Sequence, residues 1–195
     1  MDLRGKKVIL VSGSPRRREL LGGLDIPFEV DTDYDFDEDY ELPIPREKIT
    51  QFMSRMKNYG VRRPLEPGEI LISSDTMVFI DNLIMGKPHT REEAVDMLRK
   101  LSGRTHEVIT AVTVRDISHE ETITDTTKVT FRTITQEEID YYIDTYHPFD
   151  KAGAYGIQEW IGYTACTGIE GSYYNVMGFP VNKVYEELVK FAGYE

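Results

Sequence analysis

The stretch that decides the fold runs from residue 8 to residue 21 and reads Val8-Ile9-Leu10-Val11-Ser12-Gly13-Ser14-Pro15-Arg16-Arg17-Arg18-Glu19-Leu20-Leu21. Its first four residues form an apolar run rich in β-branched side chains, which is typical of a strand buried on both faces. Ser14 is a good helix N-cap, and Pro15 suits the first helical position. The stretch therefore predicts a strand, a tight turn and a helix.

The rest of the chain continues this alternation of strands and helices. Strands are expected at 28–31, at 70–72 running into 73–76, in a hairpin over 77–85, and in two long alternating segments at 106–117 and 122–131. Helices are expected at 46–59, 90–101, 135–146 and 180–191. The second and third of these helices open with capping boxes at Thr90 and Thr135, and the first has Ile49, Phe52, Met53 and Met56 on one side. We predict a mixed α/β protein with a single domain over residues 1–195.

The chain of 195 residues has a net charge of −11, and most of this charge lies in one segment. Seven acidic residues and no basic one stand between Asp31 and Glu41. A chain this acidic is not expected to hold a long nucleic acid, which needs many clustered Lys and Arg. A small phosphate ligand remains compatible, because a few local cations suffice.

The cysteine count and the hydropathy pattern argue against disulfide-bonded, cysteine-zinc and membrane-spanning proteins. Cys166 is the only cysteine, so neither an intramolecular disulfide nor a cysteine-based zinc site is expected. No stretch approaches the roughly 20 apolar residues of a membrane span. The apolar run after Lys6-Lys7 is too short for a signal peptide. We expect a soluble, cytoplasmic protein without a membrane partner.

The turn after the first strand is a candidate phosphate site. Backbone N–H groups and the helix N-terminus favour an anion there, and Ser12, Ser14, Arg16 and Arg17 add hydroxyl and guanidinium donors. Arg18 is expected to face water. The alternative is a capped helix whose arginines are solvated.

Asp75 is the candidate catalytic acid, because it follows an apolar strand and ligands bind at the carboxyl ends of strands in α/β sheets. A carboxylate there can deprotonate water or hold a divalent cation. The alternative is an aspartate that hydrogen-bonds the following turn. Lys57 and Lys87 are candidate phosphate ligands, and the alternative for each is the usual one for a lone lysine, a solvated surface residue.

Two further segments can contribute to a site. In the segment from Asp150 to Gln158, the amide of Gln158 can read a base edge, while the small residues can also serve only close backbone approach. One or two members of the acidic run can supply oxygen ligands to Mg²⁺ or Mn²⁺. Most of that run is expected to be a solvated loop.

Six segments, in this order and spacing, resemble the Maf family of nucleoside triphosphate pyrophosphatases over nearly the whole chain. They are Val11 to Leu21, Ser74 to Val78, Gly86 to Pro88, Leu101 to Val108, Asp150 to Gln158, and Gly171 to Pro180. Ser74, the pair Glu159-Trp160, and Phe179 depart from the residues that are usual in the family. The pair lies beside Gln158, so it bears on the base preference.

The resemblance implies a two-lobed α/β fold, like that of inosine triphosphatases, around a long curved mixed β-sheet with a central cleft. It also implies a cytoplasmic house-cleaning hydrolase, commonly a homodimer, that uses Mg²⁺ or Mn²⁺ to cleave a nucleotide between its α- and β-phosphates. dTTP and UTP are the expected substrates, with modified pyrimidine nucleotides as further candidates.

The resemblance also assigns residue roles. Asp75 matches the proton acceptor, and we expect it to hold the cation with Glu38. Ser12, Arg17, Glu38, Lys57 and Lys87 match polar residues of the family's cleft. Arg16, Thr76 and Gln158 match the positions that distinguish the dTTP and UTP branch from the branch acting on 7-methyl-GTP.

Two other functions stay open at this point. One is a pyrophosphatase for modified purine nucleotides such as 7-methyl-GTP. The other is a nucleotide-binding regulator of cell division that performs no turnover.

Overall fold

The computed structural model describes residues 3–35, 44–45 and 48–194. The strands are β1 (Lys7–Val11), β2 (Phe28–Asp31), β3 (Glu69–Ile80), β4 (Leu83–Met85), β5 (Thr105–Arg115), β6 (Glu120–Phe131) and β7 (Cys166–Glu170). The helices are α1 (Pro15–Gly22), α2 (Ile49–Tyr59), α3 (Arg91–Leu101), α4 (Gln136–Tyr146), α5 (Trp160–Ala165), α6 (Tyr173–Val176) and α7 (Val181–Phe191). The short 3-10 helices are η2 (Pro148–Asp150) and η3 (Ala152–Ala154).

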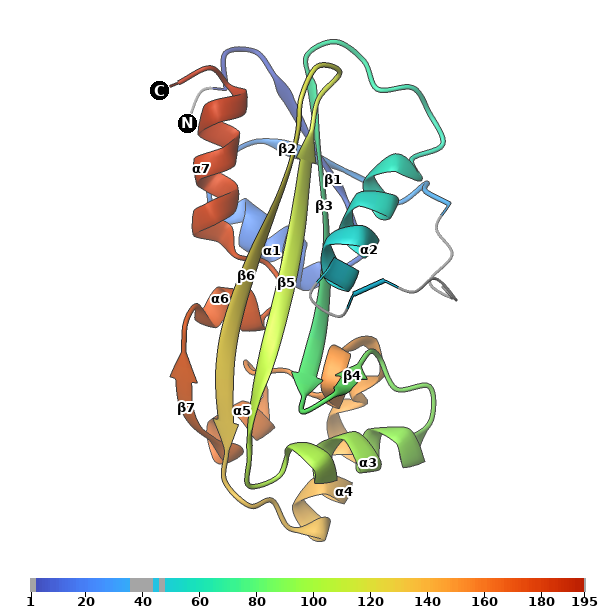
Figure 1. The fold of residues 1–195 in the computed structure, drawn as a ribbon, viewed down its shortest axis with the longest axis vertical. Helices are drawn as coiled ribbons and strands as arrows, with labels where there is room; N and C mark the ends of the chain where they lie inside the picture. Colours follow the sequence, from blue (N-terminus) through green and yellow to red (C-terminus); the bar gives the residue numbers. More distant parts are fainter. Residues whose placement is uncertain (1–2, 36–43, 46–47, 195) are drawn as a thin grey trace. The chain divides into compact units, whose positions relative to one another are not determined.

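Within the described residues, the strands form one seven-stranded sheet (Figure 1). Its order is β2-β1-β3-β5-β6-β7, and β4 pairs with β3 outside this path. β1 runs parallel to β2 and β3, whereas the pairs β3–β4 and β6–β7 are antiparallel. The prediction of a mixed α/β fold is confirmed.

The chain divides into two compact units. The first comprises Met1–Asp75, Thr110–Asp125 and Gly178–Glu195, and the second comprises Thr76–Ile109 and Thr126–Met177. The boundary therefore crosses β3, β5 and β6. The expectation of two lobes agrees with this division, while the assignment of residues 1–195 to one domain stays a prediction.

The opening strand, turn and helix are present as predicted. Val8 and Leu10 on one face of β1 are fully buried, and Ile9 and Val11 on the other face are 2 % and 1 % exposed, as expected of a strand covered on both faces. Pro15 starts α1, and Ser14 is the N-cap residue, but its side chain makes no capping hydrogen bond. Instead, the backbone N–H of Ser14 donates to Oγ of Ser12 at 3.2 Å. The turn is thus closed by Ser12 rather than by the expected cap.

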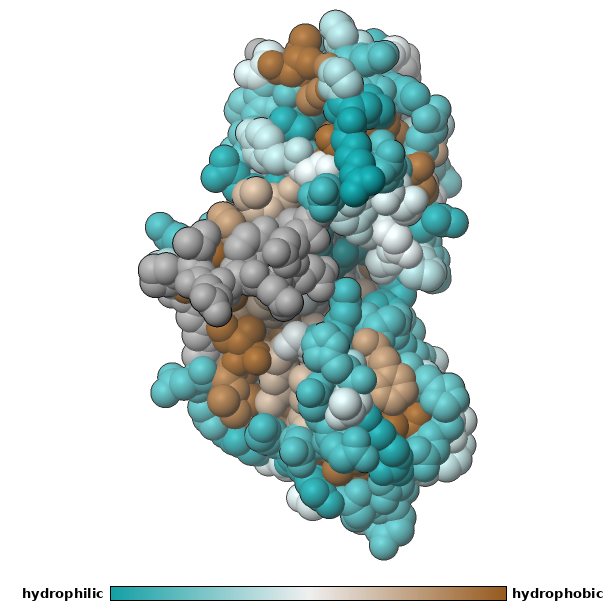
Figure 2. All heavy atoms as spheres, turned by 90° about the vertical axis from the view of Figure 1, so that its right-hand side faces the viewer, coloured by the Kyte–Doolittle hydropathy of each residue, from teal (hydrophilic) through white to brown (hydrophobic). Residues whose placement is uncertain are grey.

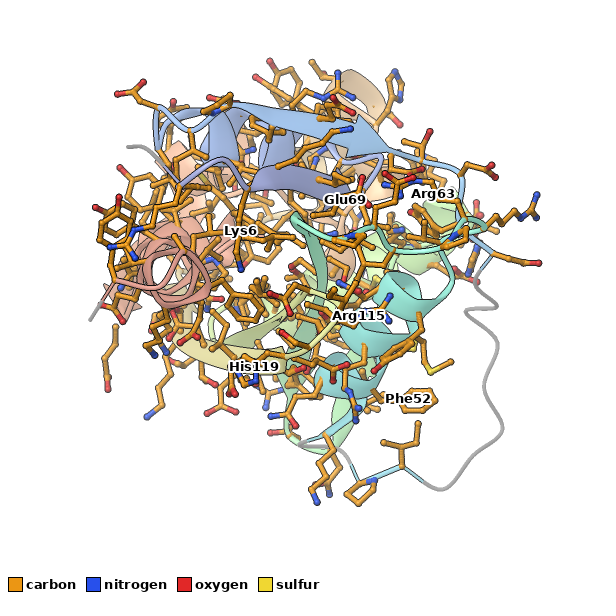
Figure 3. The ribbon with its side chains drawn as sticks, turned by 90° about the horizontal axis from the view of Figure 1, so that it is seen from above. Lys6, Phe52, Arg63, Glu69, Arg115 and His119 are labelled. Carbon is orange, nitrogen blue, oxygen red and sulfur yellow. The ribbon has the colours of Figure 1, made fainter. Side chains whose placement is uncertain are left out.

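In the first unit, α2 and α7 lie on opposite sides of the strands (Figures 1 and 3). The apolar side of α2 is buried only in part. Of the expected apolar side, Met53 is buried, whereas Ile49, Phe52 and Met56 are only partly covered. The face that is buried carries Thr50, Met53, Ser54, Lys57 and Asn58. These five positions follow the helical period, so the helix presents mostly polar groups to its neighbours.

Hydrogen bonds explain why this polar face is buried. Asn58 donates through Nδ2 to the carbonyl oxygens of Leu71 in β3 and Thr113 in β5, at 3.3 and 3.2 Å. Nε of Arg115 donates to Oδ1 of Asn58 at 2.8 Å, and Figure 3 shows Arg115 beside α2. Specific partners thus replace the apolar contacts that the hydropathy pattern suggested.

The strand that carries Asp75 does not end where the sequence suggested. β3 continues through Ser73, Ser74, Asp75 and Thr76 to Ile80, so Asp75 lies within a strand rather than at its carboxyl end. The register with β1 ends at Ser73, and the register with β4 begins at Val78. Asp75 therefore lies between the segments of β3 that pair with these two strands.

The second unit begins with the expected hairpin and contains both predicted helix caps. The turn between β3 and β4 includes Asp81 at φ 51°. Thr90 accepts the backbone N–H of Glu93 at the start of α3, and Thr135 forms a complete capping box with Glu138 at the start of α4. The segment 153–178, read from sequence only as glycine-rich, also contains α5, β7 and α6.

None of the helices in the described part of the chain is long and apolar enough to span a membrane. The face shown in Figure 2 carries hydrophobic residues in separate patches between hydrophilic ones.

His106 is a titratable group that is buried in the second unit. It is 2 % exposed, and its ring contacts Phe131 and Tyr155 edge-on. Nε2 lies 2.8 Å from the hydroxyl of Tyr155, while Nδ1 is buried without a partner among the described residues. Burial lowers the pKa of His106 to about 4, so the imidazole is neutral at pH 7.

His106 makes the stability of the protein depend on pH. Its pKa falls from 6.5 in the unfolded chain to about 4 in the fold, so between these values only the unfolded state takes up the proton. The contribution of neutral His106 to the free energy of unfolding is present above pH 6.5 and is lost as the pH falls towards 4. Between pH 7 and pH 5 the free energy of unfolding should fall by about 2 kcal/mol through this group.

The check is chemical denaturation of wild type and His106→Gln at both pH values, with exposed His89→Gln as the control. His106→Gln should lose this part of the pH dependence, and His89→Gln should keep it. An unchanged pH dependence in His106→Gln would contradict the assignment.

Candidate active site

The centre of the candidate site in the first unit is an ion pair between Lys57 and Asp75. Nζ of Lys57 lies 2.6 Å from Oδ1 of Asp75. Both residues are buried, each with 7 % of its surface exposed. The other carboxylate oxygen, Oδ2, is buried and has no hydrogen-bond partner among the described residues. One oxygen of Asp75 is therefore held in place, and the other is available.

The local folds of α2 and β3 bring these two side chains together. Alternation along β3 puts Ser73 and Asp75 on the same face of the strand. The Ser73 hydroxyl donates to the carbonyl oxygen of Ser54 at 2.7 Å, and the Ser54 hydroxyl donates to the carbonyl oxygen of Ser73 at 3.2 Å. Lys57 stands one turn beyond Ser54 on α2, so it reaches Asp75 two positions further along β3. The serine pair thus sets the register of helix against strand.

The unpartnered oxygen of Asp75 has a chemical meaning. A buried polar atom without a hydrogen bond costs about 1–3 kcal/mol, and more when the group is charged. Such atoms are rare in folded proteins unless a water, an ion or a ligand completes them. Oδ2 of Asp75 is therefore suited to accept a proton from water or to contact a cation.

The β1–α1 turn contributes a second cluster in the same unit. Ser12 is 4 % exposed, and its hydroxyl oxygen is used to accept the N–H of Ser14. Nε of Arg17 donates to the carbonyl of Gly178 at 3.0 Å, and the Ser74 hydroxyl donates to the same oxygen at 3.4 Å. Gly178 has φ 105°, a conformation that favours glycine. The carbonyl of Gly178 therefore fixes part of the Arg17 guanidinium near β3.

The remaining arginines of this turn differ in exposure. Arg18 is exposed, as expected, whereas Arg16 is half-buried. The assignment of this turn to phosphate binding stays a prediction.

Three candidate residues belong to the second unit. Thr76 follows Asp75 directly in β3 and is half-buried. Lys87 is exposed in the segment after β4, where the carbonyl of Gly86 accepts the N–H of Gly153 at 3.0 Å. Gln158 is half-buried, and its Oε1 is buried without a partner among the described residues. Gln158 therefore offers an acceptor for which the described fold supplies no donor.

A polar network around Gln158 includes residues that sequence reasoning missed. The hydroxyl of Tyr142 in α4 makes a short hydrogen bond to Oε2 of Glu159 and accepts the N–H of Gly156 at 2.9 Å. Nζ of Lys151 lies 2.7 Å from Asp150 and 3.1 Å from Glu159. Burial and the bond to Glu159 raise the pKa of Tyr142 above its ordinary value. Tyr142 gave no signal in sequence, because a tyrosine in an amphipathic helix is usual core.

One atom of the candidate site, Oδ2 of Asp75, is suited to a divalent cation. Among the described residues no group of three or more His, Cys, Asp or Glu is placed to hold a metal ion. Mg²⁺ commonly needs only one or two carboxylates, because substrate phosphates and water complete its shell. Oδ2 of Asp75 is a suitable oxygen ligand for this arrangement. Glu38, the other expected ligand, lies outside the described residues.

The ion pair should be a source of stability that depends on both partners. Lys57→Met leaves the Asp75 carboxylate buried without its counter-charge, so the free energy of unfolding should fall by about 3 kcal/mol or more. Adding Asp75→Asn to Lys57→Met removes the uncompensated charge and should restore a large part of this loss.

Urea denaturation of the two single variants and the double variant measures this coupling. Lys100→Met, at an exposed position of α3, is the control and should change stability by less than about 0.5 kcal/mol. Strictly additive effects of Lys57→Met and Asp75→Asn would refute the coupling.

Comparison with known proteins places the chain in a family. The family model described as Maf-like protein matches residues 7–191. A relative from Porphyromonas gingivalis strain W83, named dTTP/UTP pyrophosphatase, is 49 % identical over 192 residues, which are 97 % of this chain and 96 % of that protein.

Other relatives and a solved structure add to this comparison. Proteins with the same name from Bacteroides thetaiotaomicron and Flavobacterium johnsoniae are each 46 % identical, over 94 % and 95 % of this chain and 95 % of each protein. A solved Ham1 protein from Coxiella burnetii gives a TM-score of 0.46 at 14 % identity, over 65 % of this chain and 73 % of that chain. The match of the family model and the identity to these relatives extend over nearly the whole sequence, and the chain belongs to the Maf family.

Proposed function

We propose that this protein is a nucleoside triphosphate pyrophosphatase that hydrolyses dTTP and UTP to the monophosphate and pyrophosphate. Family membership and the names of relatives at 46–49 % identity support the substrate class. The observation that carries the chemistry is the buried Lys57–Asp75 pair with its one available carboxylate oxygen. Modified pyrimidine nucleotides are further candidate substrates.

Asp75 is assigned as the general base. Lys57 donates to Oδ1 of Asp75. Oδ2, which has no partner among the described residues, accepts a proton from the attacking water. Water then forms a bond to the α-phosphorus, the bond from that phosphorus to the bridging oxygen breaks, and pyrophosphate leaves with the electron pair. General-base assistance is typically worth about 10² to 10⁴ in rate.

Positive and hydroxyl groups are assigned to the polyphosphate. Arg16, Arg17, Lys57 and Lys87 balance its charge, and Ser12 and Ser14 line the turn that precedes α1. Phosphoryl transfer depends mainly on positioning and on charge neutralisation, which these residue types provide. Arg17 is partly fixed already by the carbonyl of Gly178.

A divalent cation, Mg²⁺ or Mn²⁺, would be held by Asp75 and Glu38 together with phosphate oxygens. When bound, it would neutralise negative charge on the phosphates. The support from the described residues is the unpartnered Oδ2 of Asp75.

Base selection is assigned to Arg16, Thr76 and Gln158, as the resemblance implies. The unpartnered Oε1 of Gln158 supports this role, since a base N–H is a donor of the kind it lacks. We further propose that the chain is one functional domain over residues 1–195 and acts as a cytoplasmic homodimer.

The test is a nucleotide panel with separate detection of pyrophosphate and orthophosphate. Wild type should release pyrophosphate from dTTP and UTP faster than from CTP or 7-methyl-GTP, in the presence of Mg²⁺ or Mn²⁺. Asp75→Asn should lower this rate by about 10² or more, because the amide cannot take the proton. This change also leaves the Lys57 ammonium without its counter-charge, so the rate is referred to the folded fraction, which circular dichroism measures at the assay temperature.

Asp96→Asn, on the exposed face of α3, is the matched control and should keep the wild-type rate. Near-normal turnover in Asp75→Asn would refute the assignment of the base. A preference for 7-methyl-GTP would favour the purine alternative. Nucleotide binding without pyrophosphate release under either metal would favour a regulator.

A further inference from the structure

The turn that carries Gln158 is fixed at both of its ends. The N–H of Glu159 donates to the carbonyl of Gly156 at 3.0 Å, which closes the four-residue turn 156–159. Ile157, inside this turn, is 4 % exposed and packs in the core of the second unit. Gln158 therefore follows an anchored residue and precedes another.

One hydroxyl links the two ends of this turn. Tyr142 donates to the carboxylate of Glu159 and accepts the N–H of Gly156, so its oxygen contacts both residues. Tyr142 is fully buried in α4, which gives the turn a rigid support.

Lys151 secures the same carboxylate from another side. Its Nζ lies 3.1 Å from Oε1 of Glu159, and the side chain is only 10 % exposed. At Gly156 a Cβ would lie 2.9 Å from Cδ of Glu159 and 3.1 Å from Cε of Lys151, so a larger residue there would have to displace these two side chains. The charged groups and the backbone are thus in close contact.

We propose that Tyr142, Lys151 and Glu159 are positioning residues that fix the turn 156–159 and thereby set base selectivity through Gln158. This inference rests on the proposed function, because only a nucleotide gives the Gln158 amide a base to read. It adds three residues to the specificity apparatus, and none of the three has to contact the base.

The chemistry of pyrimidines fits an amide that is carried on an anchored turn. Uracil and thymine present an imide N–H between two carbonyl groups, and an amide offers an acceptor and a donor side by side. Oε1 of Gln158, which lacks a donor among the described residues, can accept the imide N–H. Cytosine has a ring nitrogen without hydrogen at this position, so two acceptors would face each other. A site that leaves polar groups unpaired discriminates strongly, provided that it cannot rearrange.

The test measures the ratio of kcat/KM for dTTP to kcat/KM for dCTP. Both values come from the same protein preparation, so the ratio does not depend on the fraction that is folded. Tyr142→Phe removes the hydroxyl, and Glu159→Gln removes the charge while keeping the shape. Tyr146→Phe is the matched control, since this tyrosine stacks on Tyr142 and its hydroxyl has no hydrogen-bond partner among the described residues.

Tyr142→Phe and Glu159→Gln should each lower the ratio about five- to tenfold, as expected for the loss of a positioning hydrogen bond. The loss should come mainly from a higher KM for dTTP. Tyr146→Phe should keep the wild-type ratio. Gln158→Ala should lower the ratio at least as much, and adding Tyr142→Phe to it should lower the ratio no further.

An unchanged ratio in both Tyr142→Phe and Glu159→Gln would overturn the inference. So would a full additional loss when Tyr142→Phe is combined with Gln158→Ala, because the network would then act independently of Gln158.

Failure of the proposed function is recognised separately, by the absence of pyrophosphate release from dTTP in wild type. In that case the same ratio is taken from calorimetric Kd values for the α,β-imido analogues of dTTP and dCTP, with the same expectations. A wild-type protein that binds neither analogue would overturn the inference as well.

Discussion

The contact between Lys57 and Asp75 is the interaction on which the account depends. Two opposite charges at 2.6 Å, both buried, are stable only when each keeps its partner, since removing one leaves an uncompensated charge. The polar residues on the buried face of α2 support this contact. Ser54 and Asn58 donate to backbone carbonyls of β3 and thereby hold Lys57 within reach of Asp75. The available oxygen of Asp75 is a product of this arrangement. Lys57 occupies one side of the carboxylate, and the described fold leaves the other without a partner.

The sheet supplies the second condition. β3 ends its pairing with β1 at Ser73 and begins its pairing with β4 at Val78, so the intervening residues belong to neither register. A side chain within a strand, such as that of Asp75, is held more firmly than one on a loop, because its backbone is fixed by the sheet. The chain then turns at Ser12 and enters α1, whose Arg17 is tied to Gly178. In the second unit, the buried hydroxyl of Tyr142 in α4 accepts the N–H of Gly156 and fixes the turn that carries Gln158.

Local signals predicted much of this fold. The β-branched run at Val8–Val11, the caps at Thr90 and Thr135, and the hairpin turn at Asp81 each act within a few residues, so sequence alone reveals them. Polar contacts between residues distant in sequence could not be predicted from such local patterns. Ile49, Phe52 and Met56 lie on the apolar side of α2 but are only partly covered, because the buried face of the helix is held by hydrogen bonds to strands distant in sequence. Asp75 was expected at a strand end, since Ser73-Ser74-Asp75-Thr76 has no apolar pattern, yet β3 continues through it. Tyr142 was missed because its partners lie 14 and 17 residues away. The candidate residues themselves came from motifs, and Glu38 lies outside the described part of the chain.

In the proposed mechanism, water activated at the available oxygen of Asp75 attacks the α-phosphorus of the nucleotide. Turnover of dTTP in water enriched with ¹⁸O tests it most directly, with mass spectrometry of both products. Attack at the α-phosphorus places one ¹⁸O atom in the nucleoside monophosphate and none in pyrophosphate. The label in pyrophosphate, with unlabelled monophosphate, would show attack at the β-phosphorus and contradict the account.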